Sequence, residues 1–350
     1  MKYKLEMKIL TVFLLLLIIP TALSVTRTIS SSQDNIDSFI VNSHGNLWEA
    51  NGSYIQAAID NLSVYATPNG GYGGPHATVW LPANTVFTID STLQVEQHVT
   101  LDMQGSTIVP NGDFDVIIIR KGAEIKDGTI NVSPVSDFNS GAIVIYPTDR
   151  ISMRDHPLRV YNMNLLSESN RGTGLLLQTS GPTDTAMAWL DHYNIGITGF
   201  EYAIHINHSG SYSYINGNMF SDIVAHDNKY VITVFQGYSE SGYNHFHNVH
   251  CYCTDNTEYI IWNNGIGTSF NNIIVYNWDN NSGTKVAYNF IPYSGSGDQH
   301  YGADHVFLSF KGGGEDIDIQ DWDRWGFDSN AYTLLDLENG NLSLGGIGIW

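Results

Sequence analysis

Residues 116–120 read Val116-Ile117-Ile118-Ile119-Arg120, and seven similar pentapeptides of alternating apolar residues follow along the chain. They begin at Ala142, Gly174, Ala203, Val231, Ile260, Val286 and His305. Successive copies start 19 to 32 residues apart. Short β-type repeats with this period are typical of a solenoid, in which each repeat buries its apolar face by stacking on its neighbours. The repeat therefore predicts an all-β chain built as a single-stranded parallel β-helix.

A second phrase recurs with nearly the same period. Its polar member is Asn194, Asp222, Asn248 or Asn272, spaced 28, 26 and 24 residues apart. Amide or carboxylate groups stacked at one tight turn of each coil can bond the backbone of their own coil and of the next. We therefore expect a structural ladder here and assign Asp222 to it rather than to catalysis.

A short helix is expected before the first strands. Apolar residues at Ile55, Ala58, Ile59 and Leu62 have helical spacing, and Ser53 can cap them. A Gly-rich turn at residues 69–75 follows, and the apolar period then changes to two.

This opening resembles the pectate-lyase-like superfamily of right-handed parallel β-helices. The resemblance rests on the phrase Ile55 to Asp60, the strand Val79 to Ala83, and Val99-Thr100-Leu101 with Gly105. It implies a right-handed coil capped by the helix. Because this fold carries lyases, hydrolases, epimerases, phage tailspikes and adhesins, it does not name a function.

The chain divides into four expected segments: a secretory signal peptide at 1–24, a lead-in or linker at 25–49, the β-helix at 50–310 and a C-terminal cap at 311–350. Lysines precede a short apolar run that ends in small residues, as in a cleaved signal peptide; a retained membrane anchor is the alternative. We expect a secreted or cell-surface protein with no membrane span after signal removal. Glycosylation sequons beginning at Asn51, Asn61, Asn131, Asn207, Asn280 and Asn341 fit an exported glycoprotein.

The formal net charge of −20 argues against nucleic acid as a partner, since phosphates require basic surfaces. Two cysteines in 350 residues do not make a disulfide scaffold. His245, His247 and His250 lie beside Cys251 and Cys253, but strand alternation turns the cysteines inward and the first two histidines outward. Buried free thiols and a surface histidine cluster are therefore expected, in preference to a metal site.

Alternation also assigns columns of side chains in the strands that follow the ladder. The inward residues are Ile223, Val249 and Ile273, then Ala225, Cys251 and Val275. The outward residues are Val224, His250 and Ile274, then His226, Tyr252 and Tyr276. A shift of one residue in register would exchange the two faces.

A polysaccharide-binding groove is predicted from the outward aromatic, amide and histidine side chains. Its expected substrate-binding residues are His205, Phe235, His250, Trp262, Asn264, Tyr276 and Tyr288. Aromatic rings can stack on the apolar faces of pyranose rings while amides bond the hydroxyls. The alternative is that the aromatic rungs lie under loops as a satellite core.

Candidate catalytic residues are His226 and Tyr252, one coil apart, as base and acid, with Lys229 nearby in sequence. Such chemistry would belong to a polysaccharide lyase or a glycoside hydrolase. The motifs typical of polygalacturonases are missing from the chain, and its central coils are poor in basic residues. A non-catalytic structural surface protein, similar to an adhesin or tail fibre, is the alternative; the oligomeric state is left open.

An acidic C-terminal stretch is the candidate Ca²⁺ site, with Asp316, Asp318, Asp321 and Asp323 as ligands. The alternative is a solvated acidic loop, because the spacing is not that of an EF-hand. The densest basic stretch, Arg150 to Arg171, can receive an anionic sugar or form an ordinary surface loop.

Overall fold

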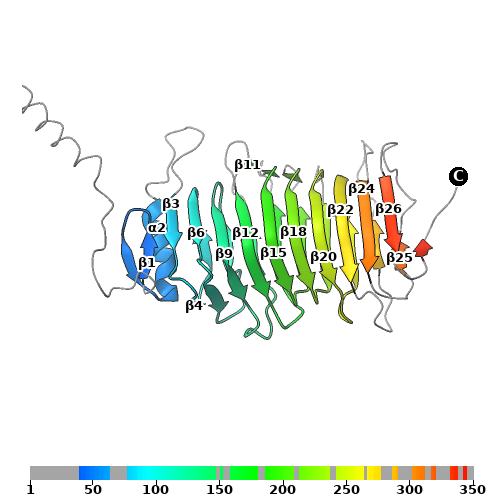
Figure 1. Ribbon diagram of the computed structural model, residues 1–350. Coiled ribbons are helices and arrows are strands. Elements are labelled where there is room, and N and C mark those ends of the chain that lie inside the picture. Colours follow the sequence, from blue (N-terminus) through cyan, green and yellow to red (C-terminus); the bar gives the residue numbers. More distant parts are fainter. Residues whose placement is uncertain are drawn as a thin grey trace, which may run out of the picture. The chain divides into compact units, whose positions relative to one another are not determined.

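Ten strands of one sheet, sheet A, stack in sequence order with parallel pairing in the computed structural model of the protein (Figure 1). They are β3 (Ala77–Trp80), β6 (Val99–Asp102), β9 (Glu124–Asn131), β12 (Arg159–Leu166), β15 (Asp191–Thr198), β18 (Met219–His226), β20 (His245–Tyr252), β22 (Ile266–Tyr276), β24 (Gly302–Lys311) and β26 (Tyr332–Leu337). Two further strands, β4 (Val86–Ile89) and β7 (Thr107–Pro110), join its N-terminal part.

A second parallel sheet of ten strands, sheet B, returns the chain after each strand of sheet A. It comprises β5 (Leu93–Val95), β8 (Ile117–Ile119), β10 (Gly141–Ile145), β13 (Thr173–Thr179), β16 (Tyr202–His208), β19 (Tyr230–Gln236), β21 (Tyr259–Asn263), β23 (Val286–Phe290), β25 (Ile317–Gln320) and β27 (Leu342–Leu344). A short sheet C contains β11 (Arg150–Ser152), β14 (Ala186–Ala188) and β17 (Tyr214–Asn216). The coils wind in a right-handed sense, which confirms the predicted parallel β-helix.

The structure describes residues 39–63, 77–146, 150–152, 158–179, 186–208, 213–236, 242–263 and 266–276, and the strands β23 to β27. Side chains are described in these ranges except at 150–152, 236, 266–267 and from 286 onward. All of these residues belong to the compact unit Asp37–Trp350. The expected signal peptide lies outside the described residues. No helix within the described part is long and apolar enough to cross a membrane.

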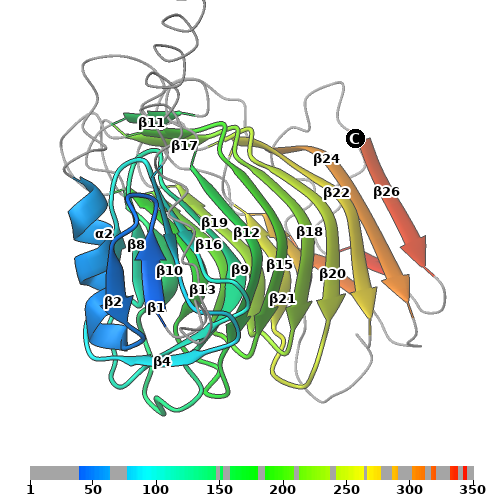
Figure 2. The ribbon, with the colours of Figure 1, turned by 60° about the vertical axis from the view of Figure 1, so that its left-hand side comes forward.

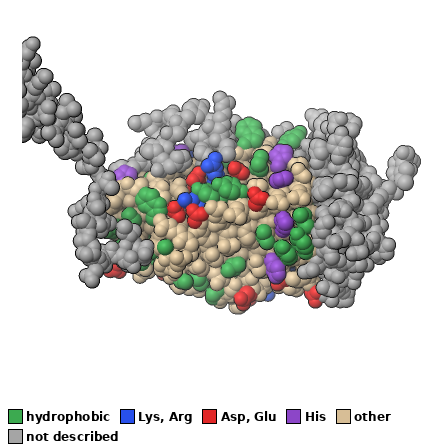
Figure 3. Space-filling view, in the orientation of Figure 1, with side chains coloured by type: hydrophobic (Ala, Val, Ile, Leu, Met, Phe, Trp, Pro, Cys, Tyr) green, Lys and Arg blue, Asp and Glu red, His purple; other side chains and the backbone are tan. Residues whose placement is uncertain are grey.

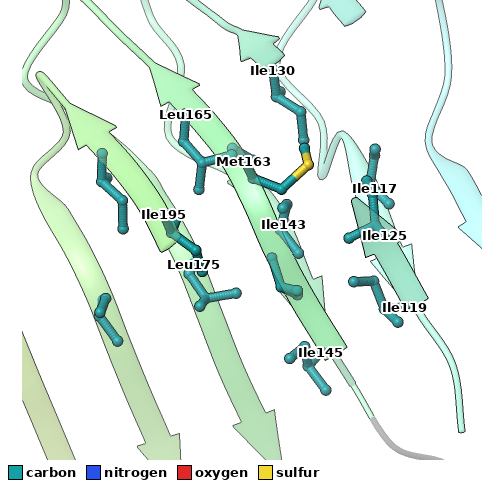
Figure 4. Close-up of a cluster of buried hydrophobic side chains, with 14 of the residues drawn as sticks. Ile117, Ile119, Ile125, Ile130, Ile143, Ile145, Met163, Leu165, Leu175 and Ile195 are labelled. Carbon is teal, nitrogen blue, oxygen red and sulfur yellow. The ribbon is translucent and has the colours of Figure 1, made fainter. Parts of the chain in front are cut away.

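The core lies between sheets A and B and follows from strand alternation. In sheet B, positions two and four of the pentapeptide point inward, so that Ile117, Ile119, Ile143 and Ile145 are fully buried. They meet inward residues of sheet A such as Met163 (Figure 4). Parallel pairing keeps the alternation in register from coil to coil, so one buried column follows another along the solenoid.

A column of aromatic rings runs through this core from coil to coil in sheet A. Phe220, Phe246 and Phe270 stack at centroid distances of 4.7 and 5.4 Å, with interplanar angles of 7° and 10°. His192 occupies the same position one coil earlier, 5.1 Å from the ring of Phe220. Neither ring nitrogen of His192 has a hydrogen-bond partner, and burial lowers the pKa of His192 to about 3.

Helix α2 (Ile55–Ser63) covers the N-terminal end of the core (Figure 2). Its four predicted inward residues are fully buried, which confirms the helical spacing. The preceding 3₁₀ turn η2 (Gly52–Tyr54) is capped by Asn51, whose Oδ1 accepts the N–H of Ser53 at 3.1 Å; the prediction that Ser53 is the cap is wrong. Gln56 forms two hydrogen bonds with the backbone of Gln94, at 2.8 and 3.2 Å, and so occupies the free edge of β5.

Strands also occur on both sides of the expected solenoid boundaries. Within the expected lead-in, β1 (Phe39–Asn42) and β2 (Leu47–Glu49) form a hairpin that pairs antiparallel with β3. Within the expected C-terminal cap, β26 continues sheet A, while β25 and β27 continue sheet B. The pentapeptide at 305–309 lies in β24 of sheet A, whereas the other seven lie in sheet B, so the prediction that it is a further copy of the same repeat is wrong.

Candidate functional site

One residue in the middle of successive sheet A strands adopts a left-handed conformation and bends the strand. These residues are Asp127, Asn162, Asn194, Asp222, Asn248 and Asn272, with φ between 53° and 57°. The first three residues form one series and the last three form another. Within each series, the side-chain Nδ2 of an asparagine donates to the side-chain Oδ1 of the residue one coil earlier, at 2.6–3.0 Å. The polar residues of the second phrase therefore form a ladder at the predicted positions, and Asp222 is part of it. The bonds join side chains of neighbouring coils, whereas bonds to the backbone were expected.

Beyond this bend, β18, β20 and β22 present two outward columns in the predicted register. His226, Tyr252 and Tyr276 form one column, and Val224, His250 and Ile274 form the other. We call these six side chains the sheet A strip. Val224 is 46% exposed and Tyr252 is 36% exposed, whereas the inward residues between them are buried. Hydrophobic and histidine side chains gather on this part of the surface (Figure 3).

The rings of the sheet A strip stack along the solenoid axis. Tyr252 and Tyr276 lie 4.6 Å apart with an interplanar angle of 10°, and His226 is tilted by 37° at 6.1 Å from Tyr252. Because the tyrosine faces cover each other, these two rings turn mainly their edges outward. The strip therefore offers a ribbon of ring edges beside the aliphatic side chain of Val224.

His250 is oriented by polar neighbours on both sides. Its Nε2 lies 3.2 Å from Oδ1 of Asn248, and its Nδ1 lies 3.4 Å from the hydroxyl of Tyr276. An amide oxygen only accepts hydrogen bonds, so Nε2 of His250 donates to Asn248. The contacts of Nε2 with Asn248 and of Nδ1 with the hydroxyl of Tyr276 together fix the orientation of the imidazole at the surface.

The surface changes character between the coil of β15 and the coil of β18. Register pairs Asp191 with Met219, Gly196 with Val224 and Thr198 with His226. At all three positions a larger apolar or aromatic side chain replaces a small or polar one. Charged side chains instead gather on the coils nearer the N-terminus (Figure 3). The strip is therefore confined to the coils of β18, β20 and β22 among the described residues.

The contacts of Lys229 are with residues other than His226 and Tyr252, the two other candidate catalytic residues. Its Nζ is 3.9 Å from a carboxylate oxygen of Glu201, 3.4 Å from one of Glu258 and 5.0 Å from the ring centre of Tyr230. Burial and the hydrogen bond that its hydroxyl donates to Glu258 raise the pKa of Tyr230 to about 12. The structure thus brings together His226 and Tyr252 but holds Lys229 in an ion-pair network.

His205, Phe235 and Trp262 lie on the outer side of sheet B, not beside the sheet A strip. His205 stacks on Tyr202 at 4.6 Å, while Phe235 and Trp262 are 5.1 Å apart. These rings are part-buried, and burial lowers the pKa of His205 to about 4. The single predicted groove is therefore divided between two sheets, and the sheet B rings form a packed, part-buried aromatic cluster.

The predicted groove residue Tyr288 is not in register with this cluster. Register pairs Tyr288 with the buried Ile261, and Asn289 with Trp262. The prediction that Tyr288 shares the outward column of Trp262 is therefore wrong by one residue, which exchanges the two faces. Asn264 lies outside the described residues.

The predicted Ca²⁺ ligands also fall beyond the described side chains. Asp316, Asp321 and Asp323 lie outside the described residues, and Asp318 lies in β25, of which only the backbone is described. Among the described residues, no three His, Cys, Asp or Glu side chains are arranged to hold a metal ion. Cys251 and Cys253 are buried, and neither forms a disulfide.

No protein-family model and no curated protein matches the chain.

Proposed function

We propose that the protein binds a polysaccharide at the sheet A strip. The observation that carries the proposal is the exposed, register-aligned set of His226, Tyr252 and Tyr276 beside Val224, on a rigid parallel sheet. Ring edges and an aliphatic side chain can contact the C–H groups of a sugar, while phenol and imidazole groups bond its hydroxyls. The resemblance of residues 50–135 to pectate-lyase-like β-helices supports a carbohydrate ligand.

A neutral polymer fits the strip better than a uronic one. The strands β18, β20 and β22 contain no lysine or arginine, and the chain has a formal net charge of −20. A polyuronate would therefore meet no cationic side chain on these strands and would be repelled by the overall charge. The N-terminal apolar run and the sequons support a secreted or cell-surface location, where such polymers occur.

Binding rather than cleavage is the proposed activity of this surface. The one carboxylate on β18, β20 and β22 is Asp222, which accepts the 2.6 Å hydrogen bond from Asn248 in the ladder. Glycoside hydrolysis uses two carboxylates on either side of the bond. Cleavage by the His226–Tyr252 pair is a separate outcome that the same samples can reveal.

The test measures binding of the purified protein to neutral glucans, xylans and mannans, and to polygalacturonate, by calorimetry. We expect binding to a neutral polymer, weakened at least about fivefold in Tyr252→Ala or Tyr276→Ala, since an aromatic contact is worth about 1 kcal/mol or more. Tyr193→Ala is the matched control, because Tyr161 and Tyr193 form a similar stacked pair on the same sheet, 5.0 Å apart.

Three results would count against the proposal. Absence of binding to every polymer would overturn it in favour of a structural surface role. Equal losses in Tyr193→Ala and Tyr252→Ala would show that the strip is not the site. New reducing ends or unsaturated uronate, lost in His226→Ala, would replace binding with catalysis.

A further inference from the structure

Trp189 is a large exposed side chain at the corner between sheet C and sheet A. It is 60% exposed, and its backbone is left-handed, with φ of 56°. This conformation costs a non-glycine residue about 1–2 kcal/mol. Strained conformations of bulky residues persist where the surrounding structure enforces them, and they point to sites of function.

The indole of Trp189 lies against a glycine in the next coil. A Cβ on Gly217 would be only 2.5 Å from the indole Cδ1, so a larger residue would displace the ring. Gly217 itself has φ of 64°. The close fit to the glycine fixes the ring at the surface, where more than half of the side chain stays open to solvent.

A second exposed aromatic residue, Tyr243, occupies the same corner two coils after Trp189, in the coil that follows Gly217. The N–H of Trp189 bonds the carbonyl of Asn216, and the N–H of Gly217 bonds that of Gly242, which aligns Trp189, Gly217 and Tyr243 in successive coils. Tyr243 is 51% exposed and also left-handed, with φ of 54°. The two aromatic side chains therefore flank the glycine.

An apolar and histidine path connects this corner with the sheet A strip. Met219, two residues after Gly217, is 48% exposed, and it pairs with the exposed His245. The exposed His247 follows on the same strand. Hydrophobic and histidine side chains continue across this face toward its upper edge (Figure 3). From Met219 to His226, the path covers seven residue steps, or about 23 Å at 3.3 Å per residue.

We propose that Trp189 and Tyr243 form a second subsite for a neutral polysaccharide, so that the bound chain lies along β18 and β20 rather than along the solenoid axis. This inference rests on the proposed function. The exposed indole supplies the free ring area that the mutually stacked Tyr252 and Tyr276 lack. A pyranose ring can place its C–H face on such a surface.

The test compares short and long oligomers of the neutral polymer that the protein binds, using trisaccharides and octasaccharides. Trp189→Gly removes the ring and is compatible with the left-handed backbone. We expect it to weaken octasaccharide binding about tenfold and to leave trisaccharide binding unchanged. Trp189→Tyr, which keeps an aromatic ring, should retain most of the affinity, and Gly217→Ala, which displaces the indole, should resemble Trp189→Gly.

The outcomes separate the two proposals. Loss of both oligomers in Tyr252→Ala, with no effect of Trp189→Gly on either, overturns the second subsite and leaves the strip in place. If Trp189→Gly weakens oligomer binding and Tyr252→Ala does not, the proposal of a subsite at Trp189 stands and the proposal of binding at the sheet A strip fails. If the unaltered protein binds no oligomer, both proposals fail. Unchanged melting temperatures in the variants confirm that the losses are not due to unfolding.

Discussion

Replacing His192 by phenylalanine should stabilise the protein, and more strongly as the solution becomes acidic. His192 lies in the core at the head of the column formed by Phe220, Phe246 and Phe270, and neither ring nitrogen has a partner. His192→Phe removes two buried polar atoms and extends the column by one ring. An unpaired buried polar group costs about 1–3 kcal/mol, which sets the expected gain near neutral pH if the larger ring packs without strain.

The pH dependence follows from the lowered pKa of His192. Burial brings the pKa to about 3 in the folded protein, whereas an unperturbed histidine in the unfolded chain titrates near 6.5. As the pH falls below about 6.5, the histidine of the unfolded chain takes up a proton while the buried ring stays neutral. The free energy of unfolding therefore decreases progressively down to about pH 3. Between pH 7.5 and pH 4 this loss is about 3 kcal/mol.

The assay is chemical denaturation at several pH values between 4 and 7.5, for the parent protein, His192→Phe and the smaller His192→Leu. The difference in unfolding free energy between variant and parent should grow by about 3 kcal/mol toward pH 4. His247→Phe, which alters an exposed histidine on the outer face of the same sheet, is the control and should show no such growth. A difference that stays constant with pH in both variants at position 192 would refute the reasoning.

Three further substitutions test the ladder and the sheet edge. Asp222→Asn should stabilise by about 0.5–1 kcal/mol, because the new amide can donate to Asn194, while Asn248→Asp should destabilise by removing a donor; thermal melting measures both. Gln56→Leu should cost about 1–2 kcal/mol by leaving the backbone N–H of Gln94 unpaired, and should increase self-association through the exposed edge of β5, measured by light scattering.

The sheet A strip could be predicted because alternation in a parallel strand leaves one choice of face. Once Ile223 and Val249 are assigned inward, the outward position of Val224 follows, and the structure agrees. The column of Tyr288 could not be placed in the same way. The pentapeptide alignment places Tyr288 beside Trp262, whereas β23 pairs Tyr288 with Ile261 and Asn289 with Trp262. A single sequence does not reveal this difference of one residue.

The aromatic corner was not predictable from periodicity. Trp189 and Tyr243 belong to no repeated phrase, and their left-handed backbones arise from contacts between coils. Lys229 likewise could not be placed from its distance in sequence to another candidate residue. It is three residues from His226, but its ion pairs are with Glu201 and Glu258 in the coils before and after its own. Proximity in sequence across a turn therefore does not indicate a shared site.

The ladder has a polarity that divides the solenoid into two blocks. Each amide donates toward the preceding coil, so an aspartate, which cannot donate when ionised, can only begin a series. Asp127 begins the first series and Asp222 begins the second, and the outer surface changes character at the same step between β15 and β18. A whole coil inserted at this step, between the coils of Asn194 and Asp222, would break no ladder bond. The junction is thus a natural point at which such a chain can lengthen or exchange its C-terminal coils while each block keeps its own series of amide bonds.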